Sequence, residues 1–351
     1  MKTSFISSLS IQTTMRHAVS KAQQDMVAAQ QEVTTGRHAD VGVALGATTA
    51  RSLDLTRDVL RIKSMLTTNS LATQRLEASE EALSRMQDLG QTVLDSLVGL
   101  GTSGDITNLA VARTTIQTSL DTFASFANTS VNGEYLFSGI DTDVKPFEDV
   151  AKEGSLARTA FTAELNTFLA GLGIAKEDMT ETDMNDFLDQ METAFADNTA
   201  TGFWAMNVSN ASDTNMKNRI SQSEIVETST NSNTEAMRKF VLTSLVAMEF
   251  MTEDMPAKTR DVATTRATGY VGQAIAGLTS TRSQLGLSAE RVKKADESLQ
   301  AQNKIIETHL NDLQSVDAYE ASTRVKGLEA LIEASYTLTA RLQQLSLVNF
   351  L

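Results

Sequence analysis

Apolar residues recur every seven positions near both ends of this 351-residue chain. Close to the N-terminus, Val19, Met26 and Val33 stand seven residues apart, and Met15, four residues before Val19, belongs to a second such series. This spacing places one apolar stripe along an α-helix, because two helical turns span about seven residues. We expect this first helix to end at Gly36, since the glycine-rich stretch that starts there disfavours a helix.

A second seven-residue repeat predicts a much longer helix, from about Thr48 to Leu100. At 1.5 Å per residue this helix would be roughly 80 Å long, a length typical of a rod. Asn69 falls on its apolar seam, where a single polar residue can fix the register of packed helices. After a glycine-containing break, a third helix is expected to bury apolar residues between Ile106 and Phe123.

The C-terminal part of the chain repeats this design. One seven-residue series runs from Leu285 to Leu313, and another begins at Leu328, so the seam shifts and we expect a joint near 315–319. Because the apolar series continue toward both chain ends, which normally fray in monomeric domains, we expect these ends to pack against other subunits. The predicted subunit-packing residues are Met15, Val19, Met26, Val33, Leu328, Leu331, Leu338, Leu342 and Leu345.

Acidic residues are concentrated in 140–255, which contains 21 Asp and Glu against 8 Lys and Arg. Pro146 and Pro256 lie at the edges of this segment, and proline interrupts helices. We therefore expect an inserted domain between two nearly neutral helical arms. Its short apolar runs predict a small α+β fold, with helices near 165–172, 184–195 and 235–251 and a strand over 220–230.

These patterns predict a mainly α protein, an elongated rod of long helices from both termini with a small α+β insert. We expect a terminal helical polymerisation domain made of 1–45 and 315–351. The helical rod domain would combine 46–139 with 256–314, and 140–255 would form the acidic insert. Nearly neutral arms can pack against further copies with little repulsion, whereas an acidic insert is expected to stay hydrated on the outside.

The composition excludes several classes of protein. The net charge of −14 has the wrong sign for a nucleic-acid partner, because such partners require clustered Lys and Arg. The chain has no cysteine, so disulfides and thiolate chemistry are excluded. The most apolar stretch, Phe240 to Met251, is shorter than the roughly 20 residues that cross a bilayer, and the N-terminus does not resemble a cleaved signal peptide. We expect neither membrane insertion nor signal cleavage.

The sequence contains no pattern typical of a catalytic, cofactor or metal site. His17, His38 and His309 lie far apart, and none has the spacing of a metal-binding motif. The acidic run at 177–189 lacks the alternating ligands, glycine and final glutamate of a calcium loop, so it is typical of a solvated helix face. We therefore expect no enzyme activity, no cofactor and no metal.

An Asn-Gly pair at 132–133 predicts a tight turn, because both residues tolerate the positive φ angles that such turns need. The segment 127–139 around this pair resembles the helix-to-turn junction of the flagellin superfamily, and 33–37 resembles the end of that family's first helix. The second half of the junction and the tail segments 333–336 and 345–351 are more similar to the hook-associated members than to filament flagellin. The positions that carry the junction motif are Asn132, Gly133, Tyr135, Leu136, Phe137, Ser138 and Gly139.

This resemblance implies a structural subunit of the bacterial flagellum that forms the junction between hook and filament. The implied partners are hook-associated protein 1, flagellin, further copies of the chain in a ring, and an export chaperone that covers the C-terminal helix. The family also implies secretion through the flagellar type III apparatus without a cleaved signal peptide. Two alternatives stay open: filament flagellin itself and, more distantly, a cytoplasmic coiled-coil scaffold or signalling protein.

Overall fold

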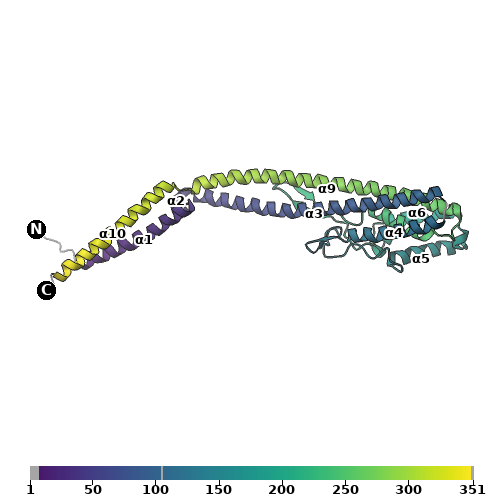
Figure 1. Ribbon diagram of the computed structural model, residues 1–351, viewed down its shortest axis with the longest axis horizontal. Coiled ribbons are helices and arrows are strands. Elements are labelled where there is room, and N and C mark those ends of the chain that lie inside the picture. Colours follow the sequence, from purple (N-terminus) through teal and green to yellow (C-terminus); the bar gives the residue numbers. More distant parts are fainter. Residues whose placement is uncertain (1–7, 104–105, 349–351) are drawn as a thin grey trace. The chain divides into compact units, whose positions relative to one another are not determined.

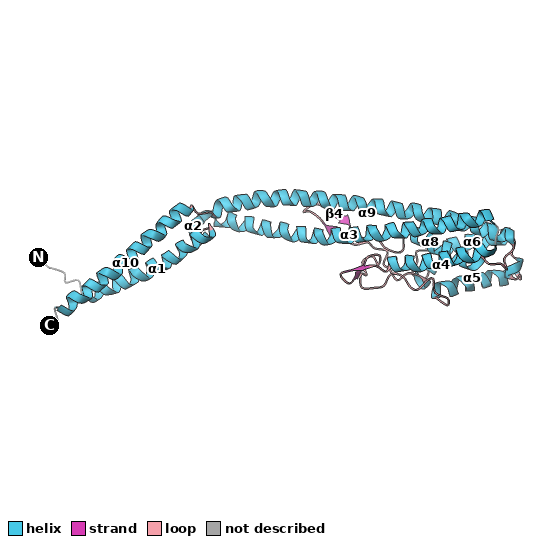
Figure 2. Cartoon of the chain, in the orientation of Figure 1, coloured by secondary structure: helices cyan, strands magenta, loops and turns pink. Residues whose placement is uncertain are grey.

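The computed structural model describes residues 8–103 and 106–348, and these are mainly helical (Figure 1 and Figure 2). The chain divides into two compact units. Unit 1 combines the chain up to Ser64 with the chain from Ser298 onward, and unit 2 comprises 65–297. The predicted fold class is confirmed, since long helices from both ends of the chain flank a region of shorter helices and small β-hairpins. The three-domain division by residue range stays a prediction.

Unit 1 is made of helices from the two ends of the chain. The first helix ends at Thr35, and Gly36 follows with a φ of 68°, a left-handed conformation that commonly terminates helices. The predicted joint near 315–319 is confirmed, because one helix ends at Gln314 and the next begins at Ala318. The elements are α1 (Ser8–Thr35), α2 (Val41–Leu45), the 3₁₀-helix η1 (Gly46–Thr48), the first part of α3 (Thr49–Ser103), the last part of α9 (Ala257–Gln314) and α10 (Ala318–Val348).

The helices of unit 1 pair in antiparallel fashion. α1 and α10 lie side by side (Figure 1), and Gln23 Nε2 donates to the Tyr336 hydroxyl at 3.0 Å. In the other pair, Lys63 on α3 and Glu307 on α9 form an ion pair at 2.8 Å. Each pair buries one narrow apolar stripe, which is the arrangement that the seven-residue repeats predict.

Unit 2 is centred on α8, whose side chains are buried on nearly every face and which packs against α4, α5 and α6 (Figure 2). The expectation that 140–255 stays hydrated is therefore wrong for α8. The charge count did not reveal this because α8 carries only two of the segment's acidic residues, Glu235 and Glu249. Besides parts of α3 and α9, the helices of unit 2 are α4 (Ile106–Ala127), α5 (Leu156–Leu172), η2 (Lys176–Asp178), α6 (Glu181–Ala196), α7 (Phe203–Asn207) and α8 (Glu235–Phe250).

Two short antiparallel hairpins complete unit 2. In the first, β1 (Ser130–Val131) pairs with β2 (Glu134–Tyr135), and the predicted turn is confirmed, since Asn132 and Gly133 have φ angles of 54° and 85°. The second pairs β3 (Lys217–Arg219) with β4 (Ile225–Glu227).

The predicted strand over 220–230 is confirmed only at 225–227, which form β4, because the chain reverses at 220–224 between β3 and β4. Ile220 N–H donates to the Glu224 carbonyl across the reversal at 3.0 Å. The Ile220 side chain is fully buried, and its own carbonyl accepts a hydrogen bond from Asn69 Nδ2 on α3 at 3.0 Å. Asn69, the polar residue of the predicted seam, therefore anchors this hairpin to α3.

Candidate assembly surface

Several predicted subunit-packing residues lie in the pair formed by α1 and α10. Met15, Val19 and Met26 on α1 and Leu328 on α10 are half-buried. The most buried side chains of this pair are smaller or were not predicted: Ala22, Ala29, Ala321 and Ile332. Ile332 lies four residues after Leu328, at ordinary helical spacing, so a 3.6-residue period would have identified it.

Other predicted residues remain in water in the single chain. Leu331 and Leu338, seven residues apart on α10, are 48% and 47% exposed, and we call these two residues the outer stripe. Val33 on α1 is 38% exposed. The side chains of Leu342 and Leu345 lie outside the described residues. Apolar side chains held in water at regular spacing are typical of surfaces that another molecule covers.

The loop at 36–40 is fixed to the joint between α9 and α10. His38 N–H donates to the Gln314 carbonyl at 3.0 Å, and Val316 N–H donates to the Gly36 carbonyl at 3.0 Å. The Arg37 side chain adds a hydrogen bond from Nη2 to Asn311 Oδ1 at 2.8 Å. The family-type residues at the end of α1 therefore connect the two terminal segments of the chain.

The junction-motif residues mainly stabilise unit 2. Asn132 and Gly133 are exposed at the turn and Tyr135 is half-buried, whereas Leu136, Phe137, Ser138 and Gly139 are buried. Their role in assembly stays a prediction.

Arg75 on α3 holds the hairpin that carries this motif. Its Nη1 donates to Glu134 Oε2 at 2.9 Å, and its Nη2 donates to the Tyr135 carbonyl at 2.6 Å. Burial lowers the pKa of the Arg75 guanidinium, and the adjacent Glu134 carboxylate opposes that effect. The motif turn is thus locked to the long helix by a buried cation.

A charged cluster joins α6, α8 and α9. Glu192 on α6 pairs with Lys239 on α8 and with Arg266 on α9, the latter at 3.0 Å. Tyr270 donates from its hydroxyl to Glu192 Oε2 at 3.2 Å, and its ring lies 4.9 Å from Lys239 Nζ. Burial raises the pKa of Tyr270 to about 12. Each charge of the cluster has a partner inside the fold, so the cluster stabilises the packing of α6, α8 and α9.

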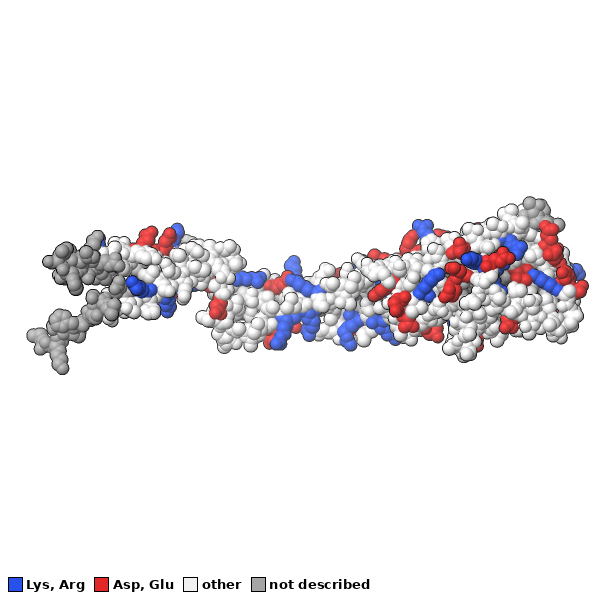
Figure 3. Space-filling model, turned by 90° about the horizontal axis from the view of Figure 1, so that it is seen from below, with Lys and Arg blue, Asp and Glu red and all other residues white. Residues whose placement is uncertain are grey.

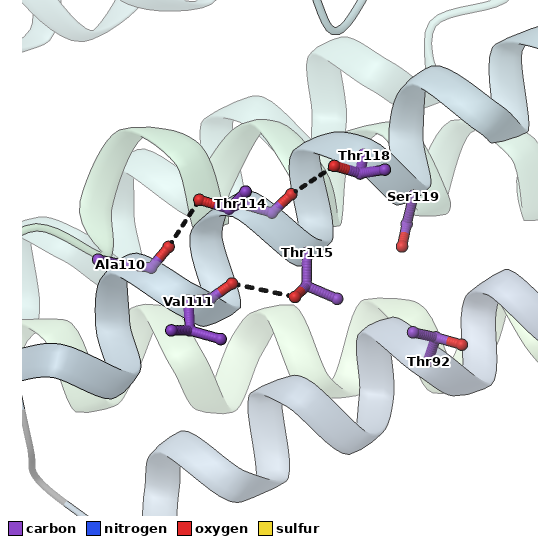
Figure 4. Close-up of a pocket in the computed structure, with 7 residues that line it drawn as sticks. All are labelled: Thr92, Ala110, Val111, Thr114, Thr115, Thr118 and Ser119. Carbon is purple, nitrogen blue, oxygen red and sulfur yellow. Dashed lines mark hydrogen bonds between the residues drawn. The ribbon is translucent and has the colours of Figure 1, made fainter.

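A shallow groove of about 570 Å³ lies between α3 and α4 in unit 2 (Figure 4). Its threonine hydroxyls donate to backbone carbonyls one helical turn earlier, as Thr114 does to Ala110 and Thr115 to Val111. The groove has no charged side chain, although patches of Asp and Glu, with Lys and Arg among them, lie on the face of unit 2 seen in Figure 3. The lining residues are Thr92, Ala110, Val111, Thr114, Thr115, Thr118 and Ser119.

Across the part of the chain that the structure describes, no three His, Asp or Glu side chains gather as a metal site. No helix in that part is long and apolar enough to cross a membrane.

Comparison with known proteins assigns the family. Residues 6–142 match the bacterial flagellin N-terminal helical region, and 268–351 match the bacterial flagellin C-terminal helical region. Together these matches cover more than half of the chain. A comparison with curated proteins gave no match.

Two solved structures are similar to this chain. One, from Vibrio parahaemolyticus and assigned as a flagellar hook-associated protein, is 10% identical with a TM-score of 0.53. The other is Bacillus cereus FlgL, at 13% identity and a TM-score of 0.38. Each comparison covers 76% of this chain and 97% of the other. The first shares the fold, and the two family matches identify this chain as a member of the flagellin superfamily and a flagellin-like structural protein of the bacterial flagellum.

Proposed function

We propose that the chain is a non-enzymatic subunit of the junction between the flagellar hook and filament, joining hook-associated protein 1 to flagellin. The observation that carries this proposal is the outer stripe: Leu331 and Leu338 stay in water on a helix pair built from both ends of the chain. Burying a fully exposed leucine contributes about 1.5–3 kcal/mol, so covering these half-exposed leucines would stabilise an assembly by about half of that for each. The similarity of the segment 132–139 to hook-associated members supports the junction over the filament.

The proposed assembly is a ring of copies in which one surface meets a different surface on the next subunit. Contacts of this heterologous kind generate rings or helical arrays. Before assembly the outer stripe needs another cover, so we further propose that an export chaperone binds α10 and that the chain is secreted without signal cleavage. These partners would bind the same leucines at different stages.

Filament flagellin is the second candidate, because both matching family models describe bacterial flagellin. A strain that lacks this chain separates the two roles. Loss of a junction subunit is expected to leave hooks without filaments while flagellin leaks into the medium. Loss of flagellin would leave a completed junction and no flagellin in the medium, and unchanged flagella would contradict both roles.

Point variants in the same strain test the surface itself. Leu331→Asp with Leu338→Asp is expected to abolish filament attachment, because a carboxylate in an apolar contact is costly to bury. Ala330→Asp with Thr337→Asp is the matched control, since it adds the same two charges at exposed positions of the same helix. Normal motility of the double variant would contradict a role for the outer stripe.

A further inference from the structure

Glu32 is the only Asp or Glu that is buried among the residues that the structure describes. It lies in the last turn of α1, and its side chain is 10% exposed. A carboxylate remains charged in such a position only when other groups satisfy its oxygens. The partners of Glu32 therefore show which segments this buried charge holds together.

Two different segments supply these partners. Arg324 on α10 donates from Nη1 to Glu32 Oε2 at 3.1 Å. The backbone N–H of Ala39 donates to Glu32 Oε1 at 3.2 Å, and His38 Nδ1 lies 3.6 Å from the same oxygen. The carboxylate thus bridges α10 and the loop that follows α1.

Arg324 also has a second, exposed partner. Its Nη2 lies 3.1 Å from Oε1 of Glu320, whose side chain is 71% exposed. Solvent screens an exposed ion pair, so losing Glu320 should change little. Losing Arg324, in contrast, leaves the buried Glu32 carboxylate without its cation. The Arg324 guanidinium, whose side chain is 47% exposed, therefore pairs with one buried carboxylate and with one exposed carboxylate.

The loop side of this bridge leads to an exposed apolar residue. Asp40 follows Ala39 directly, and its carboxylate caps α2 by accepting the Val43 N–H at 2.9 Å. Val43 is 82% exposed. Because Glu32 holds the Ala39 amide, it also fixes the start of α2 within unit 1.

We propose that Glu32 is a latch that couples the docking of α10 on α1 to the closure of the loop at 36–40. When α10 is docked, Arg324 compensates Glu32, and the carboxylate holds the Ala39 amide. When α10 leaves, Glu32 loses its cation and turns toward water, which releases the amide. In an assembling subunit, α2 and Val43 would then take up this arrangement only after α10 has docked. That last consequence rests on the proposed function, whereas the coupling itself does not.

Amide hydrogen exchange of the full-length monomer tests the latch. Arg324→Met is expected to speed exchange at 36–43 about tenfold, because Glu32 loses its cation and releases the Ala39 amide, which is a hydrogen bond to a charged group. Glu320→Gln should leave the exchange rates of the same amides within about twofold of those in the unchanged protein. Faster exchange in α10 alone, or equal effects of the two variants, would overturn the proposal.

Glu32→Gln keeps the side-chain shape and removes the charge, and it should speed exchange both at 36–43 and in α10. The double variant with Arg324→Met should match Glu32→Gln at 36–43 within about twofold, because both changes open one latch. If the accelerations of the two single variants multiply in the double variant, the coupling is contradicted. Loss of protection throughout α1 in Arg324→Met would also contradict it.

Trp204, the single tryptophan, lies in unit 2, and its unchanged emission would show that unit 2 stays folded. The monomer assay requires no flagellum. A failed latch would therefore leave the junction proposal standing, and a failed junction proposal would leave the latch standing.

Discussion

Phe123 of α4 and Phe240 of α8 stack with their ring centroids 4.0 Å apart and their planes inclined by 10°. Both rings are fully buried. This contact joins the helical arm recognised in the sequence to the acidic segment, so that segment shares its core with α4. The stability of unit 2 should depend strongly on this pair.

Phe123→Ala is expected to destabilise unit 2 by about 3–5 kcal/mol, because it removes a buried ring and leaves a cavity. Urea unfolding followed by Trp204 fluorescence measures this unit, since Trp204 belongs to it. Leu156→Ala, at a position 62% exposed, is the control and should change stability by less than about 0.5 kcal/mol. Equal effects of the two substitutions would contradict the described core.

Gly139→Ala should be far more damaging than Gly154→Ala. Both glycines have positive φ angles, 69° and 77°, so both substitutions strain the backbone by about 1 kcal/mol. A Cβ at Gly139 would also lie 2.5 Å from the Ser212 carbonyl oxygen, whereas a Cβ at Gly154 would meet no atom within 4 Å. Thermal unfolding of the two variants checks this difference. Similar melting temperatures would contradict the close packing described around Gly139.

Arg238 caps the C-terminal end of α6 from a neighbouring helix. Its Nη1 donates to the carbonyls of Phe195 and Asp197, and its Nε donates to the Asn233 carbonyl. Burial lowers the pKa of this guanidinium, but the carbonyls at a helix C-terminus favour a cation. Arg238→Met should cost about 2 kcal/mol in urea unfolding monitored by circular dichroism.

Arg219→Met is the matched control for Arg238→Met. Arg219 also donates to a backbone carbonyl, that of Gln222 at 2.9 Å, but its side chain is exposed. We expect its replacement to change stability by less than about 0.5 kcal/mol. A larger loss in Arg219→Met than in Arg238→Met would refute the capping role.

The raised pKa of Tyr270 predicts that the free energy of unfolding decreases at high pH. Burial raises its pKa to about 12, whereas an unfolded tyrosine ionises near 10. Between these values the folded chain holds one more proton than the unfolded chain, so this contribution is complete below pH 10 and decreases by up to about 1.4 kcal/mol per pH unit above it. Urea unfolding at pH 8, 10 and 11.5 should therefore show a flatter decline in Tyr270→Phe than in the unchanged protein. Parallel declines would contradict this.

The sequence predicted the long helices and their ends because repeated apolar spacing and glycine act locally. The turn at Asn132 was predicted for the same reason. The repeat did not separate Leu331, which is exposed, from Leu328, which is half-buried against α1, because a seven-residue repeat does not distinguish adjacent stripes of a 3.6-residue helix. The central place of α8 and the β3–β4 hairpin depends on contacts between distant segments, such as Asn69 with Ile220. The bridging role of Glu32 was not predicted, because its partners come from segments near both ends of the chain.

The position of the chain along the flagellum tests the central claim most directly. The chain has no cysteine, so Ala200→Cys in an exposed loop allows single-site maleimide labelling on intact cells, with the unchanged strain as the control. We predict one short labelled segment where the hook meets the filament. Label along the whole filament would identify a filament flagellin. Flagella without any label would contradict an extracellular position of the chain in the flagellum.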